Sequence, residues 1–206
     1  MIERLTTAGV FSLDGQDFDV ENNVWIVGAS SEVLVLDAPH DARRIADAVG
    51  DRHVAAIVCT HGHNDHINAA VALREIVVAR VLLHEADLEL WRSVHPDAEP
   101  DGALSPGEVV SAGGVRLSVL HTPGHTPGGC CLYDEQAGIV FSGDTLFRGG
   151  PGATGRSWSD FPTIIESIRT KLLTLPASTR VLPGHGGETT IGEEAPHLEE
   201  WIARGK

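Results

Sequence analysis

The feature that most constrains this chain is a run of six residues that holds four potential metal ligands. His61, His63, Asp65 and His66 follow the apolar segment 54–58, which reads as a buried strand. In extended backbone, side chains two residues apart point to the same side, so His61 and His63 can bind one ion together. Asp65 and His66 fall where the chain bends into a predicted helix, so they face a second position close by. Taken alone, Asp65 could instead cap that helix.

Three further segments each place a candidate ligand just after a predicted strand. A Thr-Pro-Gly-His motif ends at His125, a Leu-Pro-Gly-His motif ends at His185, and Asp144 lies in Ser-Gly-Asp-Thr. Proline presets a turn and glycine supplies an unusual dihedral angle, so each imidazole is delivered to a fixed place beyond its strand. Layered α/β folds build their sites at strand ends. Imidazole and carboxylate are ligands for zinc, iron and manganese, so the sequence predicts a metal site.

Apolar runs and helical patterns alternate along the whole chain, which predicts a single α/β or α+β domain over residues 1–206 with buried sheets. Residues 95–107 and 146–159 are rich in proline or glycine and are predicted to be irregular. Strands are predicted at 24–27, 33–36, 54–58, 80–83, 115–120, 130–133, 139–141 and 180–182, and helices at 41–49, 65–78, 85–94, 161–173 and 196–203.

Charge and cysteine content restrict the partners and the compartment. The chain has 15 Lys and Arg against 29 Asp and Glu, a formal charge of −14, and such a surface repels nucleic acid. It lacks an apolar stretch of about 18 residues and an N-terminal secretory pattern, so no membrane partner is expected. Cys59, Cys130 and Cys131 are an odd set within apolar runs, which indicates reduced core thiols and a cytoplasmic protein. The sequence carries no signal for an oligomeric state.

The motifs resemble the metallo-β-lactamase superfamily from about Asp37 to His185. The resemblance implies a four-layer αββα sandwich, with two mixed sheets face to face and helices outside. It places Asp37 where a side chain braces the ligand loop without touching metal, although a turn-forming role is an alternative. It implies one divalent ion bound by His61, His63 and His125, a second bound by Asp65, His66 and His185, and Asp144 as the bridge between them.

Within that superfamily, the segment from Phe141 to Phe147, followed by Gly149-Gly150, resembles short bacterial glyoxalase II-like proteins. The resemblance implies hydrolysis of thioesters of a low-molecular-weight thiol. Two features differ from glyoxalase II. Its Gly-Gly-Cys-Gly-Arg sequence becomes Gly-Gly-Pro-Gly-Ala here, and its basic C-terminal helical domain is replaced by 21 residues that are rich in glutamate. Thioesters of glutathione are therefore expected to be poor substrates.

The ligand set predicts a hydrolytic mechanism with two divalent ions, zinc being the first expectation and iron or manganese the alternatives. Two such ions lower the pKa of a shared water toward ~7, which supplies hydroxide to attack a carbonyl carbon. A thiolate, with a pKa near ~8.5, leaves without much help from an acid. Asp65 is the candidate to carry a proton if one is needed, and Asp144 is the candidate bridging residue.

Other reactions remain open at this stage. A mononuclear iron persulfide dioxygenase shares the first motif, and Arg148-Gly149-Gly150 resembles part of its sequence. A lactonase or a β-lactamase is a further alternative, although β-lactamases with this first motif tend to have Cys where Asp144 stands. The charge disfavours a ribonuclease. A non-catalytic metal module is also disfavoured, because a structural ion needs only four ligands.

The glycine-rich segment 147–159 is predicted to line the substrate side. Arg148 and Arg156 are candidates to bind a substrate carboxylate, and Trp158 is a candidate to pack over a substrate stem. The alternative for both arginines is pairing with acidic neighbours on the surface of this protein.

Overall fold

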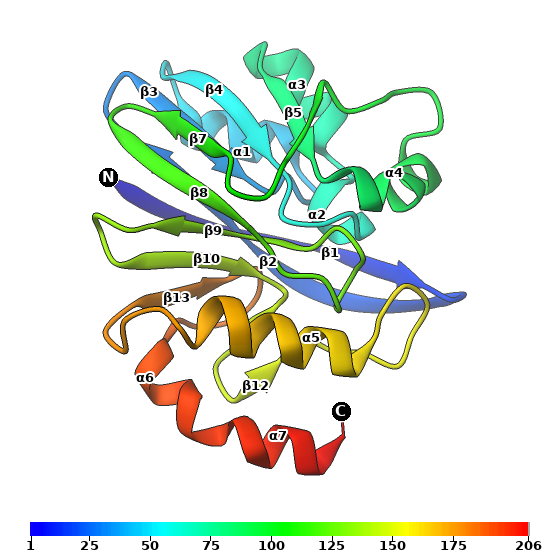
Figure 1. Ribbon diagram of the computed structural model, residues 1–206. Helices are drawn as coiled ribbons and strands as arrows, with labels where there is room; N and C mark the ends of the chain where they lie inside the picture. Colours follow the sequence, from blue (N-terminus) through cyan, green and yellow to red (C-terminus); the bar gives the residue numbers. More distant parts are fainter. Residues whose placement is uncertain (206) are drawn as a thin grey trace.

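The computed structural model describes residues 1–205 as two six-stranded sheets packed face to face, with helices outside each sheet (Figure 1). Apolar residues from both sheets, among them Leu34, Val58, Leu117 and Phe141, form the core between them. This arrangement confirms the predicted four-layer sandwich. It follows from sheets whose two faces are both apolar, since each face must be covered by another layer.

The first sheet joins an antiparallel half to a parallel half, in the order β1-β2-β3-β4-β5-β6. Helices α1 to α4 cover its outer face, where Ile45, Leu73 and Trp91 pack on the strands. The bounds are β1 Ile2–Leu13, β2 Gln16–Gly28, β3 Glu32–Leu36, β4 His53–Val58, β5 Arg80–Leu83, β6 Gly102–Ala103, α1 Ala42–Val49, α2 Asn64–Ile67, α3 Ala70–Val77, the 3-10 turn η1 Glu85–Asp87, and α4 Leu88–Val94.

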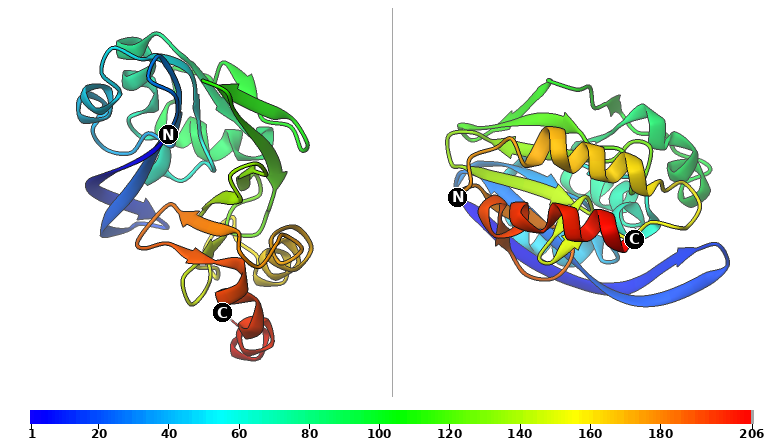
Figure 2. Two further views of the ribbon diagram at one scale, coloured as in Figure 1. Left: turned by 90° about the vertical axis from the view of Figure 1, so that its left-hand side faces the viewer. Right: turned by 60° about the horizontal axis from the view of Figure 1, so that its bottom comes forward.

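The second sheet has the order β14-β13-β10-β9-β8-β7, and its one parallel pair is β10 with β13. Figure 2 shows α5 and α7 covering its outer face, where Ile164, Ile168 and Trp201 are buried. A separate two-stranded ribbon joins β11 to β12. The bounds are β7 Val109–Ala112, β8 Val115–His121, β9 Cys130–Asp134, β10 Ile139–Gly143, β11 Leu146–Phe147, β12 Gly150–Pro151, β13 Arg180–Pro183, β14 Thr189–Thr190, α5 Phe161–Ser167, the π-helical turn η2 Ile168–Leu172, α6 Ile191–Glu194, the 3-10 turn η3 Ala195–His197, and α7 Leu198–Arg204.

The long hairpin of β1 and β2 is the main element that the sequence pattern did not predict. Its strands stay paired from Ile2 opposite Val27 to Leu13 opposite Gln16. Most of β1 is only half-buried, so it lacks the apolar run that marked the other strands. The turn at Asp14-Gly15, with φ of 53° and 72°, was the available signal, because Asp-Gly favours a tight hairpin.

Two predicted helices are interrupted, and the last one starts earlier than expected. The helix predicted at 65–78 is divided into α2 and α3 at Asn68, whose side-chain oxygen accepts a hydrogen bond from the His40 backbone. The helix predicted at 85–94 begins with a 3-10 turn. At the C-terminus, Thr190 caps α6 ahead of the predicted start, and Pro196 lies in the 3-10 turn between α6 and α7.

The state of the cysteines and the lengths of the helices agree with the expectations drawn from the sequence. Cys59, Cys130 and Cys131 are buried and unpaired, as predicted. Burial raises the pKa of each thiol, that of Cys131 to about 11, so all three behave as apolar core residues. Within residues 1–205, no helix has the length and apolar character needed to cross a bilayer.

Candidate metal centre

The seven predicted ligands meet at one edge of the sandwich, where several strands end. The loop after β4 carries the first ligands and leads into α2, the β8–β9 loop carries His125, and Asp144 and His185 directly follow β10 and β13. Because the carboxyl ends of the parallel strands β10 and β13 lie side by side, Asp144 and His185 come together although they are far apart in sequence. The ligands are His61, His63, Asp65, His66, His125, Asp144 and His185.

The two Pro-Gly-His turns place their histidines by different means. Gly124 has a φ of 129°, as its motif predicted, and a Cβ there would lie 2.2 Å from the Ile164 nitrogen. Gly184 is not among the residues with positive φ, so the prediction of an unusual dihedral was wrong for this turn. It is glycine because of close approach, since a Cβ would lie 2.4 Å from Asp144 Oδ1 and 2.6 Å from His66 Cε1.

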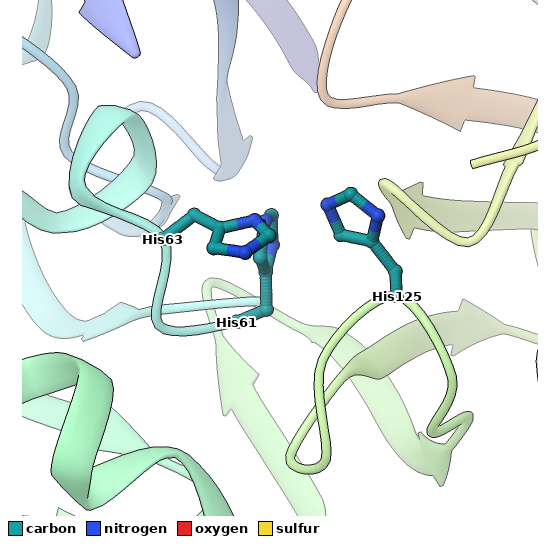
Figure 3. A group of neighbouring side chains, drawn as sticks. All are labelled: His61, His63 and His125. Atoms are coloured by element: carbon teal, nitrogen blue, oxygen red, sulfur yellow. The ribbon is translucent and has the colours of Figure 1, made fainter. Parts of the chain in front are cut away.

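The first group of ligands consists of His61, His63 and His125, whose imidazoles converge from two loops (Figure 3). His61 Nε2 lies 3.2 Å from His63 Nδ1. The ring centroid of His125 lies 5.0 Å from that of His61 and 4.6 Å from that of His63. All three offer a nitrogen within 4.8 Å of one another, a spacing that suits one shared ion.

The second group consists of Asp65, His66 and His185. His185 Nε2 lies 3.1 Å from His66 Nε2 and 3.3 Å from Asp65 Oδ2. Asp144 stands between the groups, with Oδ1 3.4 Å from His66 Nε2 and Oδ2 3.4 Å from His185 Nε2 and 3.6 Å from His125 Nε2. His61, His66 and Asp144 form a third set with ligand atoms within 4.8 Å of one another, so Asp144 is positioned to reach both groups.

Hydrogen bonds on the outer side of two histidines orient a nitrogen inward. The Nδ1 atoms of His125 and His185 lie 2.8 Å and 2.7 Å from the carbonyl oxygens of Ala153 and Glu21, to which they can only donate. That tautomer leaves the Nε2 lone pair facing the centre, which is the form that binds metal. His125 Nε2 is also buried and has no hydrogen-bond partner within residues 1–205. These donors fit divalent metal ions.

The electrostatics of the two groups differ. Burial lowers the pKa of His61 well below its usual value and that of His63 to about 3, so both stay neutral. Burial also opposes charge on His66 and His185, but Asp144 and other nearby carboxylates outweigh it, raising the pKa of His185 to about 10 and that of His66 well above its usual value. The second group therefore favours positive charge at its centre, as a site for a dication requires.

Asp37 lies beneath the ligand loop, as its predicted supporting role requires. Its Oδ1 accepts from the Thr60 backbone at 2.7 Å, and its Oδ2 accepts from the Thr60 hydroxyl at 2.9 Å and lies 2.9 Å from His66 Nδ1. The side chain is 2% exposed, and its backbone φ is 61°, which costs energy for a residue other than glycine. One carboxylate thus orients His66 and fixes the start of the loop.

We expect Asp37→Ala to weaken metal binding or activity by roughly 10- to 100-fold, because it removes the partner that orients His66. Equilibrium titration with a metal indicator and steady-state rates measure the two effects. Asp41→Ala is the control, since Asp41 caps α1 and contacts no ligand. If Asp37→Ala kept the affinity and rate of the parent, the supporting role would be wrong.

Asp87 is a functional candidate that the sequence did not reveal. It is fully buried, and its carboxylate accepts from the backbone of Gly62 at 2.8 Å and of Gly128 at 2.6 Å and from the Thr126 hydroxyl at 2.7 Å. Burial raises its pKa, and the three donors oppose that rise. Asp87 therefore ties the His61–His63 loop to the loop that carries His125. In the sequence it reads as an ordinary acidic residue of a surface helix.

Asn22 is a second residue that sequence reasoning missed, and a chain of hydrogen bonds fixes its orientation. Asn68 accepts from the His40 backbone at 2.6 Å, so its amide nitrogen faces His40 Nδ1 at 3.1 Å. His40 Nδ1 must then accept, and Nε2 donates to Asn22 Oδ1 at 2.9 Å. The Asn22 NH2 group is thereby turned to Asp65 Oδ2 at 3.0 Å. It steadies a ligand of the second group.

The three candidate substrate residues lie near the site without reaching the ligands. Arg148 donates to the Glu188 carbonyl at 2.6 Å. Arg156 lies over the Phe18 ring, 4.7 Å from its centroid, and donates to Gln16. Trp158 is 45% exposed. None of the three lines the cavity at the ligands, so their roles in binding substrate stay predictions.

Comparison with known proteins agrees with this geometry. The family model described as the metallo-beta-lactamase superfamily matches residues 18–185. The chain is 34% identical to the hydroxyacylglutathione hydrolase GloC of Haemophilus influenzae, over 78% of this chain and 82% of that protein.

Two solved structures extend the comparison. The chain resembles the BLEG-1 B3 metallo-beta-lactamase with a TM-score of 0.79 and 29% identity, over 95% of this chain and 99% of that one. It resembles TTHA1623 in a di-iron-bound form with a TM-score of 0.77 and 32% identity, over 85% of this chain and 93% of that one. On the fold, the ligand geometry and these matches, the chain belongs to the metallo-β-lactamase superfamily.

Proposed function

We propose that this chain hydrolyses thioesters of a low-molecular-weight thiol with two bound divalent ions, of which zinc is the first candidate and iron or manganese the alternatives. The observation that carries the proposal is the division of seven ligands into two groups with Asp144 between them. Such a centre, when loaded, lowers the pKa of a shared water toward ~7 and polarises a carbonyl oxygen.

The residues of the chain supply the remaining parts of the reaction. Burial raises the pKa of Asp65, but the charge of His66 and hydrogen bonds from His185 and Asn22 outweigh burial and lower it to about 2, so Asp65 is an ionised carboxylate at neutral pH. It can accept the proton of the attacking water. A thiolate leaves at neutral pH without that proton, because its pKa is near ~8.5. Phe11 and Phe147 line the cavity beside the ligands and give the substrate an apolar surface.

The comparisons support hydrolysis and leave two substrate classes in competition. GloC is named as a hydrolase of hydroxyacylglutathione, a thioester, and it supports the first class. The likeness to BLEG-1 favours hydrolysis of β-lactams as the second candidate. The named di-iron form of TTHA1623 supports two ions and also keeps iron among the candidate metals.

We expect metal-loaded protein to release free thiol from acyl thioesters, at rates well above its hydrolysis of a chromogenic β-lactam. The measurement compares thiol release, β-lactam hydrolysis and oxygen uptake with a persulfide in one preparation of known metal content. Oxygen uptake without thiol release from any thioester would contradict the proposal and favour a dioxygenase. Hydrolysis of the β-lactam alone would favour the second candidate.

The carrier thiol is tested in the same assay. The residues after His185 are acidic, so a glutathione carrier, which is itself anionic, should show a raised KM through lost ground-state binding. The same acyl group is presented on glutathione and on the neutral thiol N-acetylcysteamine. A lower KM with glutathione would leave the chemistry intact and refute this interpretation of the C-terminal segment.

A further inference from the structure

A cavity of about 300 Å³ opens directly onto the two ligand groups. One end is formed by ligands of both groups, His63, Asp65, His125, Asp144 and His185. The rest of its lining is apolar and consists of Phe11, Val20, Phe147 and Ala153. A substrate whose carbonyl reaches the ligands must therefore place the adjoining group against apolar side chains.

The β1–β2 hairpin supplies one wall of this cavity. Phe11 is paired with Phe18 across the hairpin, and Gly9 with Val20, so all four lie on the same face because the strand period is two. The Phe11 ring stacks on Phe18 at 6.2 Å between centroids and lies 5.1 Å from the His63 ring. This face of the hairpin is an apolar row that begins next to a ligand.

The hairpin is held by hydrogen bonds at two points, one in the ligand loop and one at its tip. The cavity wall that it forms is therefore fixed before substrate binds. Asn64, which lies between His63 and Asp65 in the ligand loop, accepts from the Ser12 backbone and donates to the Val10 carbonyl, both at 2.9 Å. These two residues flank Phe11, so Asn64 fixes the ring over the site. At the tip, the Ser157 backbone donates to Asp14 and Arg156 donates to Gln16.

The apolar end of the cavity offers no partner to an anionic group. Among the described residues that line it there is no Lys or Arg, whereas Asp65 and Asp144 face it. Arg156, one of the two arginines predicted to bind a substrate carboxylate, is engaged with Phe18 and Gln16. A carboxylate placed among Phe11, Val20, Phe147 and Ala153 would lose its hydration without gaining a partner.

From the apolar side chains at the end away from the ligands and the fixed hairpin, we propose that this cavity is the acyl subsite and that it takes uncharged, apolar acyl groups. The inference rests on the proposed thioester hydrolysis and adds a substrate class to it. Each methylene buried in the cavity should raise kcat/KM by about fourfold until the cavity is filled.

The test is a series of straight-chain acyl thioesters on N-acetylcysteamine, from acetyl to octanoyl, together with the succinyl thioester. Succinyl and butyryl have carbon chains of equal length and differ in the terminal carboxylate. We expect kcat/KM to rise along the series and succinyl to fall about tenfold or more below butyryl. A flat series, or a preference for succinyl, would overturn the subsite.

Substitution of Phe11 tests whether the β1–β2 hairpin forms one wall of the acyl subsite. Phe11→Ala should lower kcat/KM for octanoyl by about tenfold or more and change that for acetyl by less than about threefold. Val10→Ala is the matched control, because Val10 precedes Phe11 on the opposite face of β1 and its side chain does not line the cavity. Equal dependence on chain length in Phe11→Ala and the parent would contradict the assignment.

A binding measurement separates this inference from the proposed function. Calorimetry with thioether analogues, in which a methylene replaces the carbonyl, should show a Kd that decreases with alkyl length in the parent and less steeply in Phe11→Ala. Binding of this kind without hydrolysis of any thioester would support the apolar subsite and refute the reaction. Hydrolysis of thioesters with no dependence of binding or rate on chain length would support the proposed reaction and refute the apolar subsite.

Discussion

Asp144→Ala is expected to lose tight binding of both metal ions and to lower the rate of hydrolysis by about a thousandfold or more. The carboxylate is within reach of both ligand sets, with Oδ1 3.4 Å from His66 and Oδ2 3.4 Å from His185 and 3.6 Å from His125. The contribution of a two-ion centre to the barrier is several kcal/mol, and each ~1.4 kcal/mol is tenfold in rate. Metal content after dialysis and steady-state rates measure the two losses.

The control for Asp144→Ala is Asp134→Ala, which removes another buried aspartate from the same sheet. Asp134 accepts from the Ala137 backbone in the β9–β10 turn and contacts no ligand. Its loss should cost about 1 kcal/mol of stability and leave metal content unchanged. If Asp144→Ala retained two ions and the parent rate, the assignment of the bridge and of the site would be wrong.

Asp87→Ala is expected to reduce both stability and metal affinity, although Asp87 is not a ligand. The variant leaves three buried donors, on Gly62, Thr126 and Gly128, without an acceptor. At about 1–3 kcal/mol for each, the free energy of unfolding should fall by roughly 3 kcal/mol or more, which lowers the melting midpoint by about 10 °C.

The effect on metal distinguishes a positioning role from simple destabilisation. Asp87 joins the two loops that carry the first ligand group, so affinity should fall mainly at His61, His63 and His125 and less at the second group. Stepwise titration with Co²⁺, followed by its visible spectrum, reports the two sites separately. Asp134→Ala, destabilised away from the site, should titrate as the parent does. An equal loss of Co²⁺ affinity at both sites would show that Asp87 supports the fold and does not position the first ligand group.

The positions of the candidate metal ligands could be predicted from the sequence, because the motifs that mark them are local. An apolar strand followed by histidines at positions two apart, and Pro-Gly turns ahead of His125 and His185, fix side chains relative to their own strand. Once strands assemble with their carboxyl ends along one edge, those side chains must meet. The convergence of these candidate ligands therefore followed from sequence, while their distances did not.

The residues that support the site were not predictable, because their roles depend on contacts between distant segments. Asp87 acts on Gly62 and Thr126, and Asn22 acts on Asp65, through pairings that no local pattern marks. The hairpin escaped prediction for a related reason. One part of β1 has polar side chains on both faces, and its apolar row at Phe11 serves the cavity and not the core.

The number of metal ions bound per chain tests the central claim most directly. Protein purified without chelator, saturated with Zn²⁺ and analysed for metal and protein in the same sample, should contain two ions per chain that occupy sites of different affinity. The division of the ligands about Asp144 predicts this result. One ion at saturation, with no second site on titration, would contradict the two-ion centre and the hydrolytic mechanism built on it.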